Sequence, residues 1–145
     1  MNFREKNRLR GFSHERDLAR KFFRLGFAVM RGPASGAKSN HIIYPDIVAI
    51  KDGVIFVFEV KTSTKDRIIY VPKHQVDKLI EFSKRANALP FIVVKIVGKT
   101  GWRFIKIEYL DITKSGNYKI TPALIYNGMT FSDIISLTSK IKQSK

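Results

Sequence analysis

The chain has 145 residues, and its 27 Lys and Arg against 12 Asp and Glu give a formal net charge of +15 at pH 7. A chain of this length can form one domain with one core, and a protein this basic usually binds a polyanion, with nucleic acid a better candidate than a membrane surface. Because there is no cysteine, disulfides, zinc fingers and cysteine nucleophiles are excluded, and any metal must be held by oxygen or imidazole. No stretch has the length of apolar residues that spanning requires, and the N-terminus lacks the apolar core of a signal peptide, so we expect a cytoplasmic protein.

The first half of the chain predicts one helix followed by strands. Ser13 is the expected N-cap of a helix to about Leu25, with an apolar stripe formed by Leu18, Ala19, Phe22 and Phe23. A short strand at 27–31 and a polar loop at 32–44 follow.

Two further strands, 46–51 and 54–61, are joined by a turn at 51–53. Both are apolar at nearly every position, as expected of strands that are covered on two faces.

The second half predicts a strand at 68–71, a helix at 73–87 and a hairpin of strands 90–97 and 102–107. The inward positions of the helix are Val76, Leu79, Ile80, Ser83 and Ala86. We expect residues 1–145 to form a single domain, with 110–145 as a C-terminal extension that ends in a helix at 131–141.

Charged side chains interrupt the two apolar strands at 46–51 and 54–61. Glu59 and Lys61 are two positions apart on one strand, so they share a face, roughly 7 Å apart. If the strands pair as a hairpin, Asp46 and Glu59 lie near the same end of the ladder, far from the turn. The pattern therefore predicts two acids and one lysine in a cluster.

Glu15 adds a third acid from the predicted helix, because the apolar stripe follows it at i+3, i+4, i+7 and i+8. Three carboxylates beside Lys61 would form an all-oxygen site suited to Mg²⁺ or Mn²⁺. Such an ion can polarise a phosphodiester and lower the pKa of a bound water, while a lysine offsets transition-state charge. Metal-dependent hydrolysis of a nucleic-acid backbone is the chemistry that this set predicts.

Simpler interpretations exist for each residue. Glu59 and Lys61 would also suit a cross-strand ion pair at a sheet edge, and Glu15 would suit an exposed acid near a helix start. On that view the protein is a basic, non-catalytic nucleic-acid-binding protein. The histidines show no ligand spacing and are better read as surface or phosphate-side residues; they are His14, His41 and His74.

Several segments, taken in order, resemble a known family: "SHERDLARKFFRLGFAVMRGPASG", "YPDIVAI", "FEVK", "LIEFSKR" and "GWRFIKI". They are similar to the archaeal Holliday-junction resolvases, members of the PD-(D/E)XK nuclease superfamily. The resemblance implies a restriction-endonuclease-like α/β fold with a central mixed β-sheet flanked by helices. It also implies a homodimeric, Mg²⁺-dependent endonuclease that binds four-way DNA junctions by shape and nicks two opposing strands symmetrically, in DNA recombination and repair.

Matched position by position, the resemblance implies that Glu15, Asp46, Glu59 and Lys61 are catalytic. The metal ligands would be Asp46, Glu59, the backbone carbonyl of Val60 and also Glu15. The family's arginines and loop serine match Arg16, Arg31 and Ser35, and we add Arg10 and Lys38 as DNA-binding candidates on their charge and position.

Another nuclease of the same superfamily, acting on a different DNA substrate in repair or restriction, is the main alternative. A recombination or replication protein is a further expected partner for the C-terminal extension, although no residue there identifies one.

Overall fold

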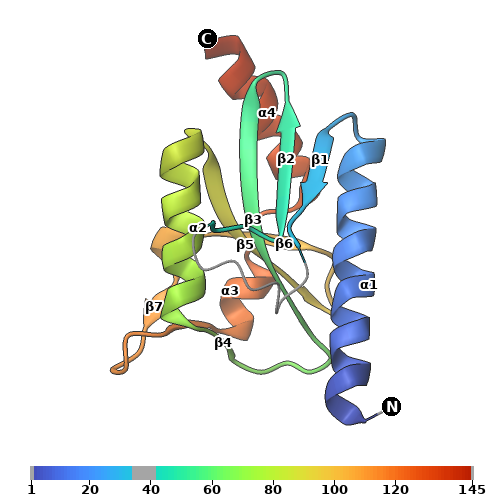
Figure 1. The fold of residues 1–145 in the computed structure, drawn as a ribbon, viewed down its shortest axis with the longest axis vertical. Helices are drawn as coiled ribbons and strands as arrows, with labels where there is room; N and C mark the ends of the chain where they lie inside the picture. The colour runs from blue at the N-terminus through green and yellow to red at the C-terminus, as the bar shows by residue number, and fades with distance from the viewer. Residues whose placement is uncertain (1, 34–41, 145) are drawn as a thin grey trace.

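The computed structural model describes residues 2–33 and 42–144 (Figure 1). Its helices and strands, in chain order, are α1 (Phe3–Arg24), β1 (Ala28–Arg31), β2 (Ile47–Lys51), β3 (Val54–Ser63), β4 (Ile69–Val71), α2 (Lys73–Ala86), β5 (Leu89–Ile96), β6 (Arg103–Lys106), the 3-10 turn η1 (Ile107–Tyr109), β7 (Asp111–Ile112), β8 (Tyr118–Ile120), α3 (Pro122–Tyr126) and α4 (Phe131–Ser144). Within these residues no helix combines the length and the apolar character needed to cross a lipid bilayer.

The main sheet has five strands in the order β1-β2-β3-β5-β6. Strands β3 and β5 run parallel, because α2 crosses from one to the other, and the remaining neighbours are antiparallel. The predicted α/β fold with a central mixed sheet flanked by helices is confirmed. A second, smaller sheet of order β4-β8-β7 lies beside it.

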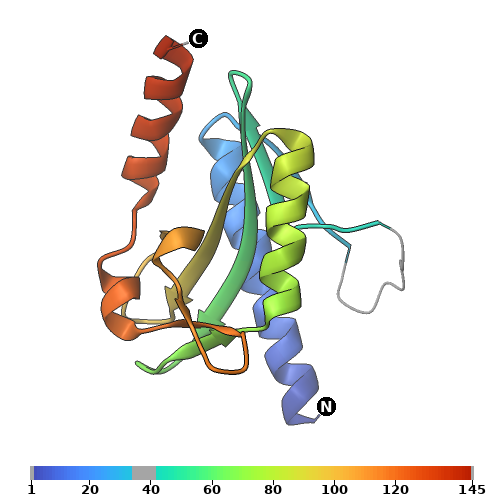
Figure 2. The same ribbon diagram turned by 90° about the vertical axis from the view of Figure 1, so that its left-hand side faces the viewer.

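Helices cover both faces of the main sheet (Figure 2). On one face α1 and α4 enclose an aromatic cluster in which Phe22 stacks on Phe58 with ring centroids 5.2 Å apart. On the other face α2 buries Val76 and Leu79 against the opposite side of β3 and β5. The two-sided burial explains why β2 and β3 are apolar at nearly every position.

The first helix begins eleven residues earlier than an N-cap at Ser13 predicts. Asn2 is the N-cap: its side chain accepts from the backbone N–H of Glu5, whose carboxylate accepts from the N–H of Asn2 in return. This capping box outcompetes Ser13, and the helix continues through Gly11, which costs about 1 kcal/mol relative to alanine. Phe23, expected in the apolar stripe, is 71% exposed, because α1 packs through Leu18 and Phe22.

The hairpin of β2 and β3 turns at Asp52 and Gly53, with φ angles of 52° and 77°. Both values are positive, as a type I′ turn needs, and the turn thereby sets the register of the two strands. The short elements β7, β8 and α3 were not predicted, because elements of two to five residues show no measurable periodicity.

Candidate active site

Asp46 and Glu59 lie opposite each other at the open end of the β2–β3 hairpin. The ladder pairs Ile47 with Phe58, and one further step along it brings Asp46 to Glu59, far from the turn as the sequence predicted. The two carboxyl groups lie close enough for a protonated Glu59 to donate a hydrogen bond to Asp46. Glu59 and Lys61 project to the α2 face of β3, because they alternate along the strand with Phe56 and Phe58, which face α1.

The backbone around Asp46 is held on both sides. Its N–H donates to the carbonyl of Phe58 at 3.0 Å, and its carbonyl accepts from the N–H of Gly32 at 2.8 Å. Its side-chain Oδ2 accepts from the N–H of Val60, also at 2.8 Å, and so takes the place of a backbone acceptor at the strand end. These three bonds fix Asp46 between β3 and the end of β1 before any ligand is present.

Gly32 makes this arrangement possible. A Cβ atom on Gly32 would collide with the backbone carbonyl oxygen of Pro45, the residue before Asp46. Only glycine lets the end of β1 approach so closely. The sequence placed Gly32 in a loop and indicated no role for it. The one available signal was a glycine directly after the first strand, where a close backbone approach is common.

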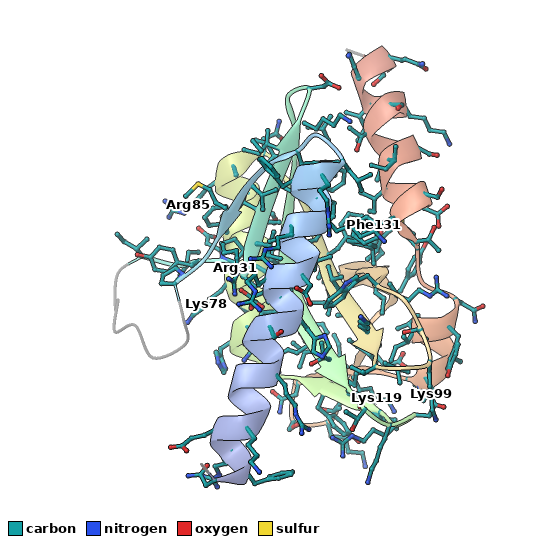
Figure 3. The ribbon with its side chains drawn as sticks, turned by 90° about the vertical axis from the view of Figure 1, so that its right-hand side faces the viewer. Arg31, Lys78, Arg85, Lys99, Lys119 and Phe131 are labelled. Atoms are coloured by element: carbon teal, nitrogen blue, oxygen red, sulfur yellow. The ribbon has the colours of Figure 1, made fainter. Side chains whose placement is uncertain are left out.

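Glu15 reaches the same region from α1, where its carboxylate pairs with Arg31 at the end of β1. Both Nε and Nη2 of Arg31 lie 3.4 Å from Oε1 of Glu15. Arg31 lies beside α1 near the middle of that helix (Figure 3). The sequence predicted Glu15 in line with the apolar stripe of the helix, but it did not identify Arg31 as the cation that pairs with it.

Lys61 has two neighbours of different kinds. Its Nζ donates to Oε1 of Gln75 at 2.6 Å, and it lies 3.9 Å from Oε1 of Glu59. Gln75 belongs to the first turn of α2, and sequence reasoning missed it. The signal available was a polar residue just inside the predicted helix start, one position before the buried Val76.

The three acids hold their protons unusually tightly. Burial first, and then the charge of Asp46, raise the pKa of Glu59 to about 8. Burial and the same charge raise the pKa of Glu15 to about 7, against the lowering effect of Arg31. Burial also raises the pKa of Asp46, although the Val60 amide and the charge of Lys61 act in the opposite direction. At neutral pH Glu59 therefore shares a proton with Asp46.

These residues fit a hard divalent cation. Three carboxylates face two cations, Lys61 and Arg31, so the cluster carries an excess of acid in a chain whose net charge is +15. Burial is the main cause that raises the pKa values of all three carboxyl groups, and the nearby cations do not fully offset it. Oxygen donors of this kind are what Mg²⁺ and Mn²⁺ prefer.

The structure modifies one detail of the expected site. The sequence predicted three converging carboxylates, whereas in the part of the chain that is described no three acidic or imidazole side chains close on a single point. Asp46 and Glu59 are in contact. Glu15 pairs with Arg31 instead, but the Glu15 carboxylate lies close enough for its charge to act on Glu59. Completing an ion's coordination would therefore require groups such as the Val60 carbonyl or water.

The other DNA-binding candidates are spread over the surface. Arg10 and Arg16 are exposed on α1, and Arg10 lines a groove on its N-terminal half. Ser35 and Lys38 lie outside the described residues.

Comparisons with known proteins agree with one another. The family model described as archaeal Holliday junction resolvase (Hjc) matches residues 6–143. The crossover junction endodeoxyribonuclease Hjc of Sulfurisphaera tokodaii is 39% identical over 140 residues, covering 95% of this chain and 94% of that protein. The enzyme of the same name from Sulfolobus acidocaldarius is 34% identical over 130 residues, with 89% and 88% covered.

The solved structure of Archaeoglobus fulgidus Hjc, a Holliday junction resolvase, superimposes with a TM-score of 0.71 at 25% sequence identity, covering 83% of this chain and 98% of that one. The family model covers nearly the whole chain, and the relatives match over most of their own lengths. The chain belongs to the archaeal Holliday junction resolvase (Hjc) family.

Proposed function

We propose that this protein is a crossover junction endodeoxyribonuclease that resolves four-way DNA junctions by metal-dependent phosphodiester hydrolysis at the cluster of Glu15, Asp46, Glu59 and Lys61. The observation that carries the proposal is the position of Asp46 opposite Glu59, with Lys61 beside them, inside a chain that matches the Hjc family over residues 6–143.

The chain's own residues have separate tasks in this mechanism. Asp46 is fixed by the N–H of Val60 and shares a proton with Glu59, and that proton must leave before both carboxylates can act as ligands. Lys61, whose Nζ is held by Gln75, offsets the negative charge that develops on the phosphate. Arg31 keeps Glu15 aligned and lowers the cost of its charge.

The ion that fits this donor set is Mg²⁺, with Mn²⁺ as a substitute, and Asp46, Glu59, the Val60 carbonyl and Glu15 would hold it. When bound it supplies Lewis-acid polarisation of the scissile phosphodiester and activates the water nucleophile.

The ion-pair alternative is less consistent with these residues. A structural pair would satisfy each acid with one cation, but Glu59 is half-buried beside Asp46 and lies 3.9 Å from Lys61, whose closer contact is with Gln75. Carboxyl groups whose pKa values are raised because burial outweighs their nearby cations are typical of functional sites.

We further propose that the protein acts as a homodimer in the cytoplasm. A four-way junction has approximate twofold symmetry, so an isologous pair of active sites matches the two strands that must be nicked. Large apolar side chains are exposed in the second half of the chain, among them Tyr109 at 59% and Ile112 at 65%. Light scattering of the purified protein measures the stoichiometry directly.

Residues 1–145 are proposed to form one nuclease domain that includes the extension at 110–145. The extension shares both cores: Ile125 of α3 belongs to the cluster beneath α2, and Ile134 of α4 belongs to the cluster beneath α1. Removing it would therefore expose core residues rather than release an independent unit.

The test is cleavage of an end-labelled, immobile four-way junction with Mg²⁺, beside EDTA, linear duplex of the same sequence and the Asp46→Asn variant. Paired, symmetric nicks that require metal and Asp46 are expected on the junction alone. Equal cutting of junction and duplex would point to another nuclease of the superfamily, and binding without nicking under any divalent ion would support the non-catalytic interpretation.

A further inference from the structure

A groove of about 750 Å³ lies between the N-terminal half of α1 and the segment that follows β3. One wall carries Arg10 and His14, which are one helical turn apart. The other wall carries Lys65 and Arg67. Its lining also includes Phe3, Thr62, Ser63, Thr64 and Val97, and no Asp or Glu is among these described lining residues.

The segment 62–67 is held in place rather than left to solvent. Ser63 is buried, its Oγ accepts from the N–H of Lys65 at 3.2 Å, and the same hydroxyl donates to the carbonyl of Lys65 at 2.9 Å. The carbonyl of Ser63 accepts from the N–H of Val97 at 2.8 Å, which ties the segment to the end of β5. A fixed segment presents its cations at defined positions, and so loses less entropy on binding.

The only acid of this segment, Asp66, does not line the groove. Its Oδ2 accepts from Nζ of Lys99 at 2.9 Å, and its Oδ1 accepts from the hydroxyl of Tyr126 at 2.8 Å. Lys99 lies low on the molecule, well away from Arg31 (Figure 3). Because Asp66 pairs with Lys99 and Tyr126, it does not offset the positive charge that Lys65 and Arg67, on either side of it, bring to the groove.

The groove is close to the active site without being part of it. Thr62 follows Lys61 along β3, and His14 precedes Glu15 along α1. Successive residues of a strand face opposite ways, so Thr62 points to the face of β3 opposite Lys61. A ligand in the groove would therefore lie beside the scissile phosphate rather than on it.

We infer that this groove binds the phosphate backbone of a DNA arm that flanks the cleaved strand. Its walls supply four basic side chains and threonine hydroxyls, which are the groups that contact phosphate and sugar without reading base sequence. The inference rests on the proposed function and extends it, since it assigns a second contact with the substrate outside the catalytic cluster.

The experiment measures affinity for a labelled four-way junction by fluorescence anisotropy in EDTA, over 50 to 200 mM salt. It compares wild type with Arg10→Gln/Arg67→Gln, which removes one cation from each wall. The matched control, Lys140→Gln/Lys142→Gln, removes two cations from α4, whose C-terminal end lies at the opposite end of the molecule from the N-terminus (Figure 1). His14 is left unchanged because it adjoins Glu15.

Losing two phosphate contacts should reduce the log–log salt slope by about 1.8, so that wild type loses roughly 12-fold more affinity over this range than the groove variant. The control should keep the wild-type slope. An unchanged slope in the groove variant, or an equal change in the control, overturns the inference. If thermal unfolding shows that the groove variant is not folded, Lys65→Gln replaces it, and the log–log salt slope should then fall by about 0.9.

Cleavage by wild type with Mg²⁺ is measured in parallel. Failure to nick the junction would refute the proposed function whatever the salt slopes show. Normal nicking with an unchanged slope in the groove variant would refute the groove alone.

Discussion

The Nζ atom of Lys61 donates to Oε1 of Gln75 over 2.6 Å, whereas the same atom lies 3.9 Å from Oε1 of Glu59. The lysine is thus held by a neutral amide from α2 rather than by the nearest acid of its own strand. An ammonium held in this way keeps its charge available for a substrate phosphate, since a tight pair with Glu59 would already have neutralised it.

Removing Gln75 should therefore weaken cleavage without weakening binding. In Gln75→Met the side chain keeps its length but loses the acceptor, so Lys61 can turn to Glu59, and we expect a fall of about 10-fold in single-turnover cleavage at saturating protein. Gln75→Glu restores an acceptor but pairs Lys61 with a carboxylate, so it should not recover the loss. Equal rates for wild type and Gln75→Met would mean that Gln75 does not position Lys61.

Lys61→Ala should retain junction binding and lose most cleavage. Removing one group that stabilises transition-state charge costs on the order of 100-fold or more in rate. Lys140→Ala, which removes the same charge from α4, is the control and should cleave normally. Anisotropy in EDTA and single-turnover cleavage with Mg²⁺ give the two quantities separately; undiminished cleavage by Lys61→Ala would show that this lysine has no catalytic role.

The metal-free protein should lose stability as pH rises. The folded-state pKa of Glu59, about 8, lies above its ordinary value of 4.5, so between these values the folded state binds more protons than the unfolded state. The stability that the protonated carboxyl provides is complete below about pH 4.5 and is lost as the pH passes 8. Glu15, with a pKa of about 7, acts in the same direction.

Glu59→Gln should flatten this dependence, because an amide does not ionise. In EDTA at pH 9 the variant should exceed wild type in free energy of unfolding by roughly 2 to 4 kcal/mol, and the two should converge near pH 4.5. Adding Mg²⁺ should stabilise wild type and leave the variant largely unaffected. Chemical denaturation across pH measures this; parallel curves for the two proteins would show that Glu59 is not buried as an under-compensated acid.

Gly32→Ala should displace Asp46. The added methyl group meets the carbonyl oxygen of Pro45, so the end of β1 and the segment before β2 must move apart, and the hydrogen bond from Gly32 to Asp46 is weakened. Small displacements of a catalytic group cost on the order of 100-fold in rate, and the clash should cost about 1–3 kcal/mol of stability.

Gly101→Ala is the control for this substitution, because an added Cβ there meets open space. It should cleave at the wild-type rate. If Gly32→Ala cleaves as well as Gly101→Ala, the close approach at Gly32 is not needed to place Asp46.

By itself the sequence determined the central hairpin and much of the site. The apolar runs around Asp46 and Glu59 can be buried only as covered strands, and the Asp52–Gly53 turn sets their register, so that the two acids meet at the far end of the ladder. The family resemblance, carried by short segments of the chain, is confirmed by the match over residues 6–143.

Only the tertiary structure decided how the acids are compensated and how the cations are arranged. Arg31 on β1 meets Glu15 on α1, and Gln75 on α2 meets Lys61 on β3. Asp66, in turn, is neutralised by Lys99. These contacts join elements that are distant in the chain, and no local periodicity encodes them. They depend on which faces of the sheet the helices cover, and that is determined by packing of the whole core.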